Sequence, residues 1–443
     1  VDGPYGAFSV TVSPEGSHVY VAGTYDDAVA VFARNPDTGH LTFVEATRNG
    51  QDNVNGLDAV HSVTLTQDGR HGYAAGTNED ALVVFGRNPD TGHLTFIETL
   101  KDGHSGVDGL SGAFSVTVSP DGNNVYVAGT YEDAVAVFSR DAGTGHLIFV
   151  EALKDGQNGV EGLDSVRSVT VSPDGKHVYA SGAYDNALSL FSRDTDTGRL
   201  TFVEAIIDDQ NDVDGLSAAI FVTVSPDGRN VYAAGGQDNA IAVFNRDEIT
   251  GRLTFVQVVK NGKGPVYGLG GASSIIVSPD GNHLYATGWA DDALVIFARD
   301  RTAGRLTFIE AVVNGQGSID SLDGIASAAV SPDGRYVYTA SIFDNAVAVF
   351  KTGGPQYVNV TLGQVAQGVD FGNHKLLRSD VDLDDCVNMR DFAMIASRWG
   401  QTECQGISWC GGTDLNRNGC VDLADVAFTA TEWLQSGERH VFP

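Results

Sequence analysis

The sequence has few basic residues and no long apolar run. It contains 27 Lys and Arg against 57 Asp and Glu, which gives a formal net charge of −30. A field of this sign repels nucleic acids and anionic membranes, so neither is expected as a partner. No stretch reaches the roughly eighteen apolar residues of a membrane helix, so no membrane span is expected either. The acidic excess favours solubility and divalent cations instead.

Cysteine is confined to the C-terminal part of the chain. The four cysteines are Cys386, Cys404, Cys410 and Cys420. A clustered, even set predicts two disulfides in an oxidising compartment, with three possible pairings, and the lack of Cys-x-x-Cys spacing makes zinc the weaker alternative. The chain also begins without methionine, at a segment (1–3) that recurs as a loop at 107–109. We therefore expect a secreted, extracellular protein whose signal peptide has been removed.

A turn of the form Ser-Pro-Asp-Gly is repeated throughout most of the chain. It occurs seven times at a spacing of 53 residues, starting at residues 13, 66, 119, 172, 225, 278 and 331. Periodicity on this scale predicts a solenoid or a propeller, and seven near-identical copies favour a closed ring.

Each repeat contains four short segments with the composition of strands. In the third repeat they are residues 113–118, 125–128, 134–138 and 147–151, and no helical periodicity interrupts them. The repeat therefore predicts an all-β, seven-bladed propeller with four-stranded blades over residues 1–362. In the last repeat, residues 357–362 are expected to supply the outer strand, with little strand exchange between the chain ends.

The repeated motifs also resemble those of a known family. Ser-Pro-Asp-Gly, Val-Tyr-Val-Ala, Asn-Ala-Val-Ala-Val-Phe and Thr-Gly-x-Leu-Thr-Phe are similar to the repeats of lactonase-type seven-bladed propellers. In that family a His and an Arg at strand starts, with a Glu after the second strand, form the active site. The resemblance points to His61 and Arg167 as the matching His and Arg.

The family's glutamate has no counterpart here. The matching positions are occupied by Thr24, Thr77, Thr130, Ala183, Gly236, Trp289 and Ile342. A lactone hydrolase needs a base to activate water and a cation to hold the oxyanion. A His–Arg pair without a carboxylate to orient the imidazole is incomplete, so the sequence favours a channel without catalysis. No nucleophile elbow, phosphate loop or dinucleotide fingerprint is present.

Acidic residues recur before the third strand of every repeat. The first of each pair is Asp26, Glu79, Glu132, Asp185, Asp238, Asp291 or Asp344, and the next residue is Asp or Asn. Asp and Asn at turns commonly accept hydrogen bonds from nearby backbone, which explains most of this pattern. Calcium sites in these turns and in loops such as 208–215 are the alternative.

Two twelve-residue segments near the C-terminus have the ligand spacing of calcium loops. The predicted ligands of the first are Asp380, Asp382, Asp384, Cys386 (through its carbonyl), Asn388 and Asp391. Those of the second are Asp414, Asn416, Asn418, Cys420 (through its carbonyl), Asp422 and Asp425. Alternating oxygen ligands suit Ca²⁺. Each loop precedes an apolar segment, 392–399 or 426–434, that we expect to be helical.

This pair of loops resembles a type I dockerin over residues 379–435, after a linker at 363–378 and before a tail at 436–443. The resemblance implies a cohesin-type receptor. Asp385 replaces an expected glycine, and Met389-Arg390 and Leu423-Ala424 occupy recognition positions that are often hydroxylic. The more apolar face suggests docking onto another copy of the protein instead.

Three functions are compatible with these features. The sequence favours a secreted, non-catalytic structural protein that self-assembles into filaments or docks through its calcium-ordered tail. The first alternative is a cell-surface lactonase-like or glycan-active hydrolase that uses His61 and Arg167. The second is a carbohydrate-binding propeller in which Trp289 or loop tyrosines stack on glycans.

Overall fold

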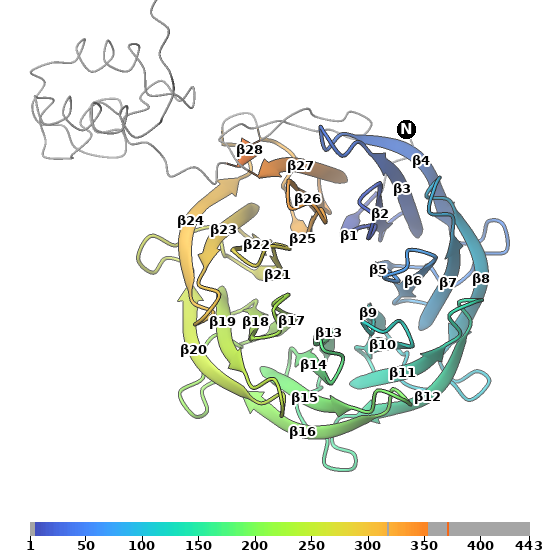
Figure 1. Ribbon diagram of the computed structural model, residues 1–443, viewed down its shortest axis with the longest axis horizontal. Helices are drawn as coiled ribbons and strands as arrows, with labels where there is room; N and C mark the ends of the chain where they lie inside the picture. Colours follow the sequence, from blue (N-terminus) through green and yellow to red (C-terminus); the bar gives the residue numbers. More distant parts are fainter. Residues whose placement is uncertain (1–4, 317–318, 353–369, 372–443) are drawn as a thin grey trace, which may run out of the picture. The chain divides into compact units, whose positions relative to one another are not determined.

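The protein was analysed as a computed structural model, which describes residues 5–316, 319–352 and 370–371 (Figure 1). Seven four-stranded sheets are arranged in a ring around a central opening. The predicted all-β, seven-bladed propeller is thereby confirmed. Within these residues no helix is long and apolar enough to cross a membrane.

The blades follow one another in chain order, each running from the innermost strand outward. Blades one to four consist of β1 (Ala7–Val12), β2 (His18–Gly23), β3 (Ala28–Arg34), β4 (Leu41–Arg48); β5 (Val60–Leu65), β6 (His71–Gly76), β7 (Ala81–Arg87), β8 (Leu94–Lys101); β9 (Ala113–Val118), β10 (Asn124–Gly129), β11 (Ala134–Arg140), β12 (Leu147–Lys154); and β13 (Val166–Val171), β14 (His177–Gly182), β15 (Ala187–Arg193), β16 (Leu200–Ile207). Blades five to seven consist of β17 (Ala219–Val224), β18 (Asn230–Gly235), β19 (Ala240–Arg246), β20 (Leu253–Lys260); β21 (Ala272–Val277), β22 (His283–Gly288), β23 (Ala293–Arg299), β24 (Leu306–Val313); and β25 (Ile325–Val330), β26 (Tyr336–Ser341), β27 (Ala346–Thr352), β28 (Asp370–Phe371).

The repeated turn connects the first two strands of each blade. In blade three the amide of Gly122 donates to the carbonyl of Ser119 at 2.8 Å, and the Ser119 hydroxyl donates to Asp121 at 2.5 Å. Gly122 has a φ of +72°, a conformation that glycine adopts without steric cost. A hydroxyl that bonds a carboxylate and a glycine at positive φ therefore stabilise the turn together.

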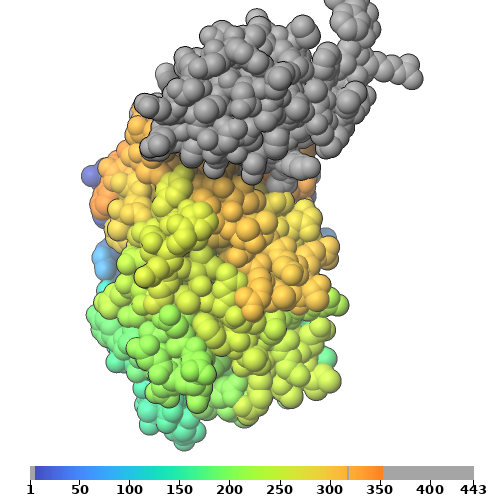
Figure 2. Space-filling view, turned by 90° about the vertical axis from the view of Figure 1, so that its left-hand side faces the viewer, coloured from blue at the N-terminus to red at the C-terminus, as the bar shows by residue number. Residues whose placement is uncertain are grey.

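The hydrophobic core lies between blades rather than within one blade. Alternate residues of a strand point to opposite faces of its sheet, so Val125 and Val127 of β10 pack toward blade two, while Tyr126 and Ala128 pack toward blade four. All six residues of β10 are buried. Figure 2 shows the outer edge of the ring, where blades four to six lie side by side in chain order.

An arginine at the end of the third strand joins neighbouring blades. In blade three, Arg140 donates from Nε to the Tyr73 hydroxyl of blade two at 2.9 Å and from Nη1 to the Gly122 carbonyl at 2.8 Å. Its Nη2 lies 2.7 Å from Nδ1 of His71. We call this arrangement the arginine clasp. The same position is arginine in blades one to six and Thr352 in blade seven.

The ring closes between blades seven and one through side chains. Arg34 donates to the Tyr338 hydroxyl at 2.6 Å, and the Gly6 amide donates to Asn345 at 2.7 Å. Strands β1 to β4 all belong to the first repeat, so the prediction of little strand exchange agrees with the described strands.

The outer strand of blade seven differs from the prediction. Residues 357–362, which we expected to form it, lie outside the described residues. The described partner of β27 is β28, which runs parallel to it, with Lys351 opposite Asp370 and Thr352 opposite Phe371. A parallel pair cannot be joined by a tight hairpin, and 17 residues of the sequence separate β27 from β28.

The C-terminal predictions concern a part of the chain beyond the described residues. The twelve calcium-ligand residues, the two expected helices, the four cysteines and the residues 379–435 all lie outside the described residues.

Candidate active site

The first strand of every blade begins with a β-bulge. In blade one Ala7 pairs with Gly23 and Ser9 with Ala22, so that Phe8 between them has no partner in the ladder. A bulge redirects the side chain of the extra residue. The seven bulge residues are Phe8, His61, Phe114, Arg167, Ile220, Ser273 and Ala326.

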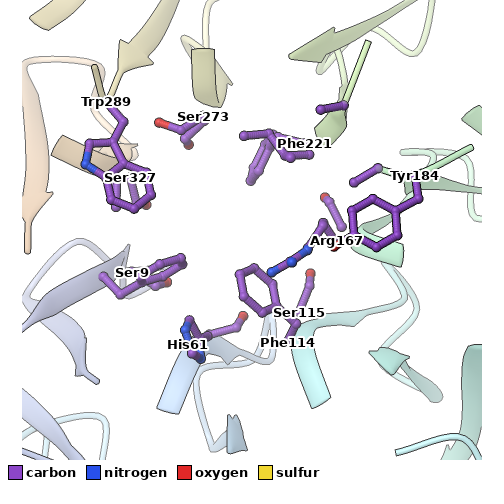
Figure 3. Close-up of a pocket in the computed structure, with 18 residues that line it drawn as sticks. Ser9, His61, Phe114, Ser115, Arg167, Tyr184, Phe221, Ser273, Trp289 and Ser327 are labelled. Carbon is purple, nitrogen blue, oxygen red and sulfur yellow. The ribbon is translucent and has the colours of Figure 1, made fainter. Parts of the chain in front are cut away.

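These bulge residues all line one cavity at the centre of the ring (Figure 3). Its volume is about 490 Å³. Further lining residues include Trp289 and Tyr184, and serines such as Ser9, Ser273 and Ser327. Of the 18 described residues that line the cavity, Arg167 alone carries a formal charge. The expectation that His61 and Arg167 point toward the channel thus agrees with the geometry.

His61 is oriented by two neutral oxygen atoms. Its Nδ1 lies 2.7 Å from the Ala59 carbonyl and 2.8 Å from the Thr77 hydroxyl. A carbonyl only accepts hydrogen bonds, so Nδ1 carries the proton and Nε2 of the neutral ring has a free lone pair. The Thr77 hydroxyl donates to the Ala113 carbonyl at 2.8 Å and therefore presents its own lone pair to Nδ1.

Burial lowers the pKa of His61 to about 4. The nearby charge of Arg167 also lowers this pKa, whereas the hydrogen bond to Ala59 raises it. The imidazole is therefore neutral near neutral pH. A neutral imidazole with a free Nε2 is the form that accepts a proton.

Phe114 holds the imidazole and the guanidinium in place. The His61 ring stacks on Phe114 with centroids 4.5 Å apart and an interplanar angle of 26°. The Arg167 Cζ lies 4.8 Å from the centroid of the same ring, a cation–π contact. Phe8 packs edge-on against both His61 and Phe114, at 4.5 and 5.5 Å. A base and a cation are thus fixed against one aromatic ring.

The position of the missing carboxylate has a structural role in three blades. Thr24, Thr77 and Thr130 each donate a hydroxyl hydrogen bond to a carbonyl of the next blade, at 2.9, 2.8 and 2.7 Å. In blade two the same hydroxyl also contacts His61. Sequence reasoning did not identify Ala59 or Thr77 as site residues, because one acts through its backbone and the other is shared with blades that have no histidine.

The acidic pairs support the bulges. The second residue of each pair accepts a hydrogen bond from the backbone amide two residues before a bulge residue; Asp27 accepts from Ala59 at 2.9 Å, and Asp133 accepts from Ser165 at 2.7 Å. Ala59 and Ser165 have φ values of +51° and +54°, which are unfavourable for residues with a Cβ. These hydrogen bonds help to hold the backbone conformation that positions His61 and Arg167.

Two acidic clusters could in principle hold a cation. They consist of Asp102, Asp108 and Glu132, and of Asp208, Asp214 and Asp238. In the first cluster, Lys154 Nζ lies 2.8 Å from Asp108 and 2.7 Å from Glu132. Lys260 lies in the second cluster in the same way. A lysine ammonium already pairs with two carboxylates of each cluster, and calcium in the propeller loops stays a prediction.

Comparisons with known proteins identify relatives of the propeller. A model of the family described as lactonase, 7-bladed beta-propeller, matches residues 2–108, 67–214 and 220–317. A 6-phosphogluconolactonase of Klebsiella pneumoniae is 24% identical over 256 residues, which cover 56% of this chain and 69% of the relative.

Solved structures share the fold. A periplasmic gluconolactonase of Pseudomonas aeruginosa has a TM-score of 0.58 at 22% identity, with 78% of this chain and 93% of that chain covered. A hydrazine synthase of Kuenenia stuttgartiensis has the same TM-score of 0.58 at 19% identity, with 79% and 96% covered. Because so different an enzyme matches equally well, similarity at this level of identity shows the fold alone.

The comparisons contradict one expectation from the sequence. We predicted a non-catalytic structural protein that self-assembles or docks, mainly because the family glutamate is absent. The family match and the named lactonase relative show that this prediction is wrong, and they agree better with the alternative of a lactonase-like hydrolase. The prediction assumed that a carboxylate must orient the imidazole, whereas uncharged groups contact Nδ1 of His61 in the structure.

Proposed function

The chain belongs to the family of lactonases with a seven-bladed β-propeller, and we propose that it hydrolyses the ester bond of a small cyclic lactone in the central cavity. The observation that carries this proposal is the pairing of a neutral imidazole and a guanidinium against Phe114. These are the two groups that lactone hydrolysis requires.

The reaction uses the groups of the cavity in two steps. In the first, Nε2 of His61 removes a proton from a water molecule while the water oxygen bonds to the lactone carbonyl carbon. The carbonyl oxygen becomes an oxyanion, which Arg167 stabilises. In the second, the carbonyl re-forms, the bond from this carbon to the ring oxygen breaks, and the imidazolium returns its proton to that oxygen. The product is the open-chain hydroxy acid.

Ala59 and Thr77 are positioning residues in this mechanism. Their oxygen atoms accept hydrogen bonds from the Nδ1–H group, so the proton stays on Nδ1 and Nε2 keeps its lone pair. The imidazolium formed during the reaction has Arg167 nearby, and this repulsion is offset by the oxyanion that develops in the same step. The attraction between the oxyanion and both cations therefore lowers the barrier.

The test is hydrolysis of aldonolactones by the purified full chain near neutral pH, measured as acid release above the spontaneous rate. We expect His61→Gln to lower kcat/KM about 10²- to 10⁴-fold and Arg167→Ala to lower it about 10²- to 10³-fold. Arg167→Lys should retain part of the activity, because it keeps the charge.

His104→Gln is the matched control. Nδ1 of His104 lies 2.7 Å from the carbonyl two residues earlier, as in His61, but His104 is an exposed loop residue outside the cavity. Its loss should leave the rate unchanged. Wild-type rates in both His61→Gln and Arg167→Ala would show that the chemistry is elsewhere, and an inactive wild type on a broad lactone panel would refute the proposed function.

A further inference from the structure

Exposed aromatic side chains lie next to the inner strands of three adjacent blades. Trp289 follows the second strand of blade six, Phe343 that of blade seven and Tyr25 that of blade one, and Tyr5 precedes β1. Their exposed fractions are 41%, 54%, 55% and 52%. The Trp289 and Phe343 rings have centroids 6.1 Å apart, and the Tyr5 and Tyr25 rings 5.4 Å. We call these four residues the aromatic rim.

One member of the aromatic rim, Trp289, connects it to the cavity. Trp289 also belongs to the cavity lining, as does Tyr184, which follows the second strand of blade four. In Figure 3 Trp289 lies beside Ser327 and Ser273, across the cavity from Arg167. A ligand held at His61 and Arg167 can therefore extend toward Trp289 without leaving the cavity.

The size of the cavity exceeds what one small ring needs. Its volume of about 490 Å³ falls in the range of pockets that hold drug-sized ligands. Large exposed aromatic groups next to a pocket also require a reason, because exposing several of them together is unfavourable in water. The geometry indicates a second binding position for part of the substrate.

The charges and hydroxyl groups define what this position accepts. Arg167 is the one charged group in the described lining and is needed for the oxyanion, so a phosphate dianion would lack a cation of its own. The chain's net charge of −30 further disfavours an added anion. Aromatic faces beside serine hydroxyls suit a sugar ring, which presents C–H groups on its faces and hydroxyls at its edge.

We infer that the substrate is an uncharged aldonolactone bearing a second sugar ring, with the lactone ring at His61 and Arg167 and the second ring on Trp289 and Phe343. This inference rests on the proposed function, since it assigns a substrate class to the same cavity. It differs from a phosphorylated monosaccharide lactone, the substrate implied by the name of the Klebsiella pneumoniae relative.

The experiment compares kcat/KM of the full chain for three substrates: a monosaccharide 1,5-lactone, its 6-phosphate, and a disaccharide 1,5-lactone. We expect the disaccharide lactone to be preferred over the monosaccharide lactone by about tenfold or more, the increment of one good stacking contact. The phosphorylated lactone should be the poorest substrate.

Variants of the aromatic rim test whether the second sugar ring binds at a position distinct from the reaction centre. Trp289→Ala should reduce the disaccharide preference to about one while changing the rate on the monosaccharide lactone less than about threefold. Trp289→Phe should retain most of the preference, which shows that a loss in Trp289→Ala is not unfolding. Tyr131→Ala is the matched control, because Tyr131 occupies the same repeat position as Phe343 and is 67% exposed, but it lies on blade three and not beside Trp289 of blade six.

The outcomes distinguish this inference from the proposed function. Hydrolysis of the monosaccharide lactone with no preference for the disaccharide, or equal losses on both in Trp289→Ala, would overturn the second-ring position and leave the lactonase intact. Preference for the 6-phosphate would overturn the charge argument. If none of the three lactones is hydrolysed, both proposals fail.

Discussion

In the proposed mechanism, uncharged groups orient the His61 imidazole in place of a carboxylate. In the family pattern a glutamate accompanies the histidine, whereas here the Ala59 carbonyl and the Thr77 hydroxyl determine which nitrogen carries the proton. Because neither group is charged, the hydrogen bond to the Ala59 carbonyl raises the pKa of His61 by less than burial lowers it, and that pKa falls to about 4. The residue is therefore a weaker base that is neutral over a wider pH range.

The pH profile of hydrolysis follows from this shift. His61 acts in its neutral form, so kcat/KM should be constant near neutral pH and decrease only as the pH falls toward the His61 pKa of about 4. Arg167→Ala removes one cause of the low pKa, so the residual activity of that variant should begin to decrease at a higher pH than in the wild type. Initial rates across the acid range provide the measurement. An acid limb centred near the ordinary histidine pKa in both proteins would contradict the assigned role of burial.

Thr77 offers a test of positioning. Thr77→Val and Thr130→Val each remove a hydroxyl bond to the next blade, at 2.8 and 2.7 Å, and each should lower the free energy of unfolding by about 1 kcal/mol. Only Thr77 contacts His61, so only Thr77→Val should lower kcat, by roughly tenfold, and alter the pH profile. Equal kinetics in the two variants would mean that Ala59 alone orients the imidazole.

At the scale of elements, the arginine clasp holds neighbouring blades together. In blade four, Arg193 donates to the Tyr126 hydroxyl at 2.7 Å, and this hydroxyl donates to the Gly198 carbonyl at 2.9 Å. Tyr126→Phe should lower the free energy of unfolding by about 1–3 kcal/mol, because a buried guanidinium loses an acceptor.

Tyr285→Phe is the control, since blade seven has Thr352 instead of the arginine that would reach this tyrosine. Chemical denaturation should show a smaller decrease in the free energy of unfolding for Tyr285→Phe than for Tyr126→Phe. A larger decrease for Tyr285→Phe would contradict the role of the arginine clasp.

The clasp also predicts sensitivity to acid. Nη2 of Arg140 lies 2.7 Å from Nδ1 of His71, and burial, followed by the charge of Arg140, lowers the His71 pKa. Because the folded pKa lies below the unfolded value of 6.5, stability from this site is full above that pH and is lost as the pH falls.

Carboxylates of the repeated turns extend this effect to lower pH. Hydrogen bonds from arginine and serine outweigh burial and hold the pKa of Glu15 and of Asp333 at about 2. Their stabilisation is present above the ordinary carboxyl pKa and is lost toward pH 2. Melting temperatures should therefore fall in two stages below neutral pH. A melting temperature that is independent of pH between about 7 and 3 would contradict both assignments.

Some elements could be predicted from sequence, and others could not. The Ser-Pro-Asp-Gly turn and the four apolar segments of each repeat predict the strands of a blade. The 53-residue spacing of the turns predicts the number of blades. The bulges at Phe8 and its equivalents depend on pairing with the second strand and on hydrogen bonds such as that from Ala59 to Asp27 across a blade boundary. The parallel β28 likewise depends on a distant segment that has no repeat signature.

For the molecule as a whole, the ring provides seven equivalent positions around one cavity and the substitutions at single blades provide chemistry. His61 and Arg167 were found from sequence because they depart from the other repeats at one bulge position. Their coupling through Phe114, and the neutral groups behind His61, required the folded ring. The sequence therefore identified the two side chains on which the proposed mechanism rests, whereas its prediction of a non-catalytic structural protein was wrong.

The most direct test of this account is the rate of lactone opening by the full chain near neutral pH, compared among the wild type, His61→Gln and His104→Gln. We predict saturable hydrolysis above the spontaneous rate that is retained in His104→Gln and reduced at least about 100-fold in His61→Gln. Equal rates in all three proteins, or no rate above the spontaneous one, would contradict the assignment of the central cavity as a lactonase site.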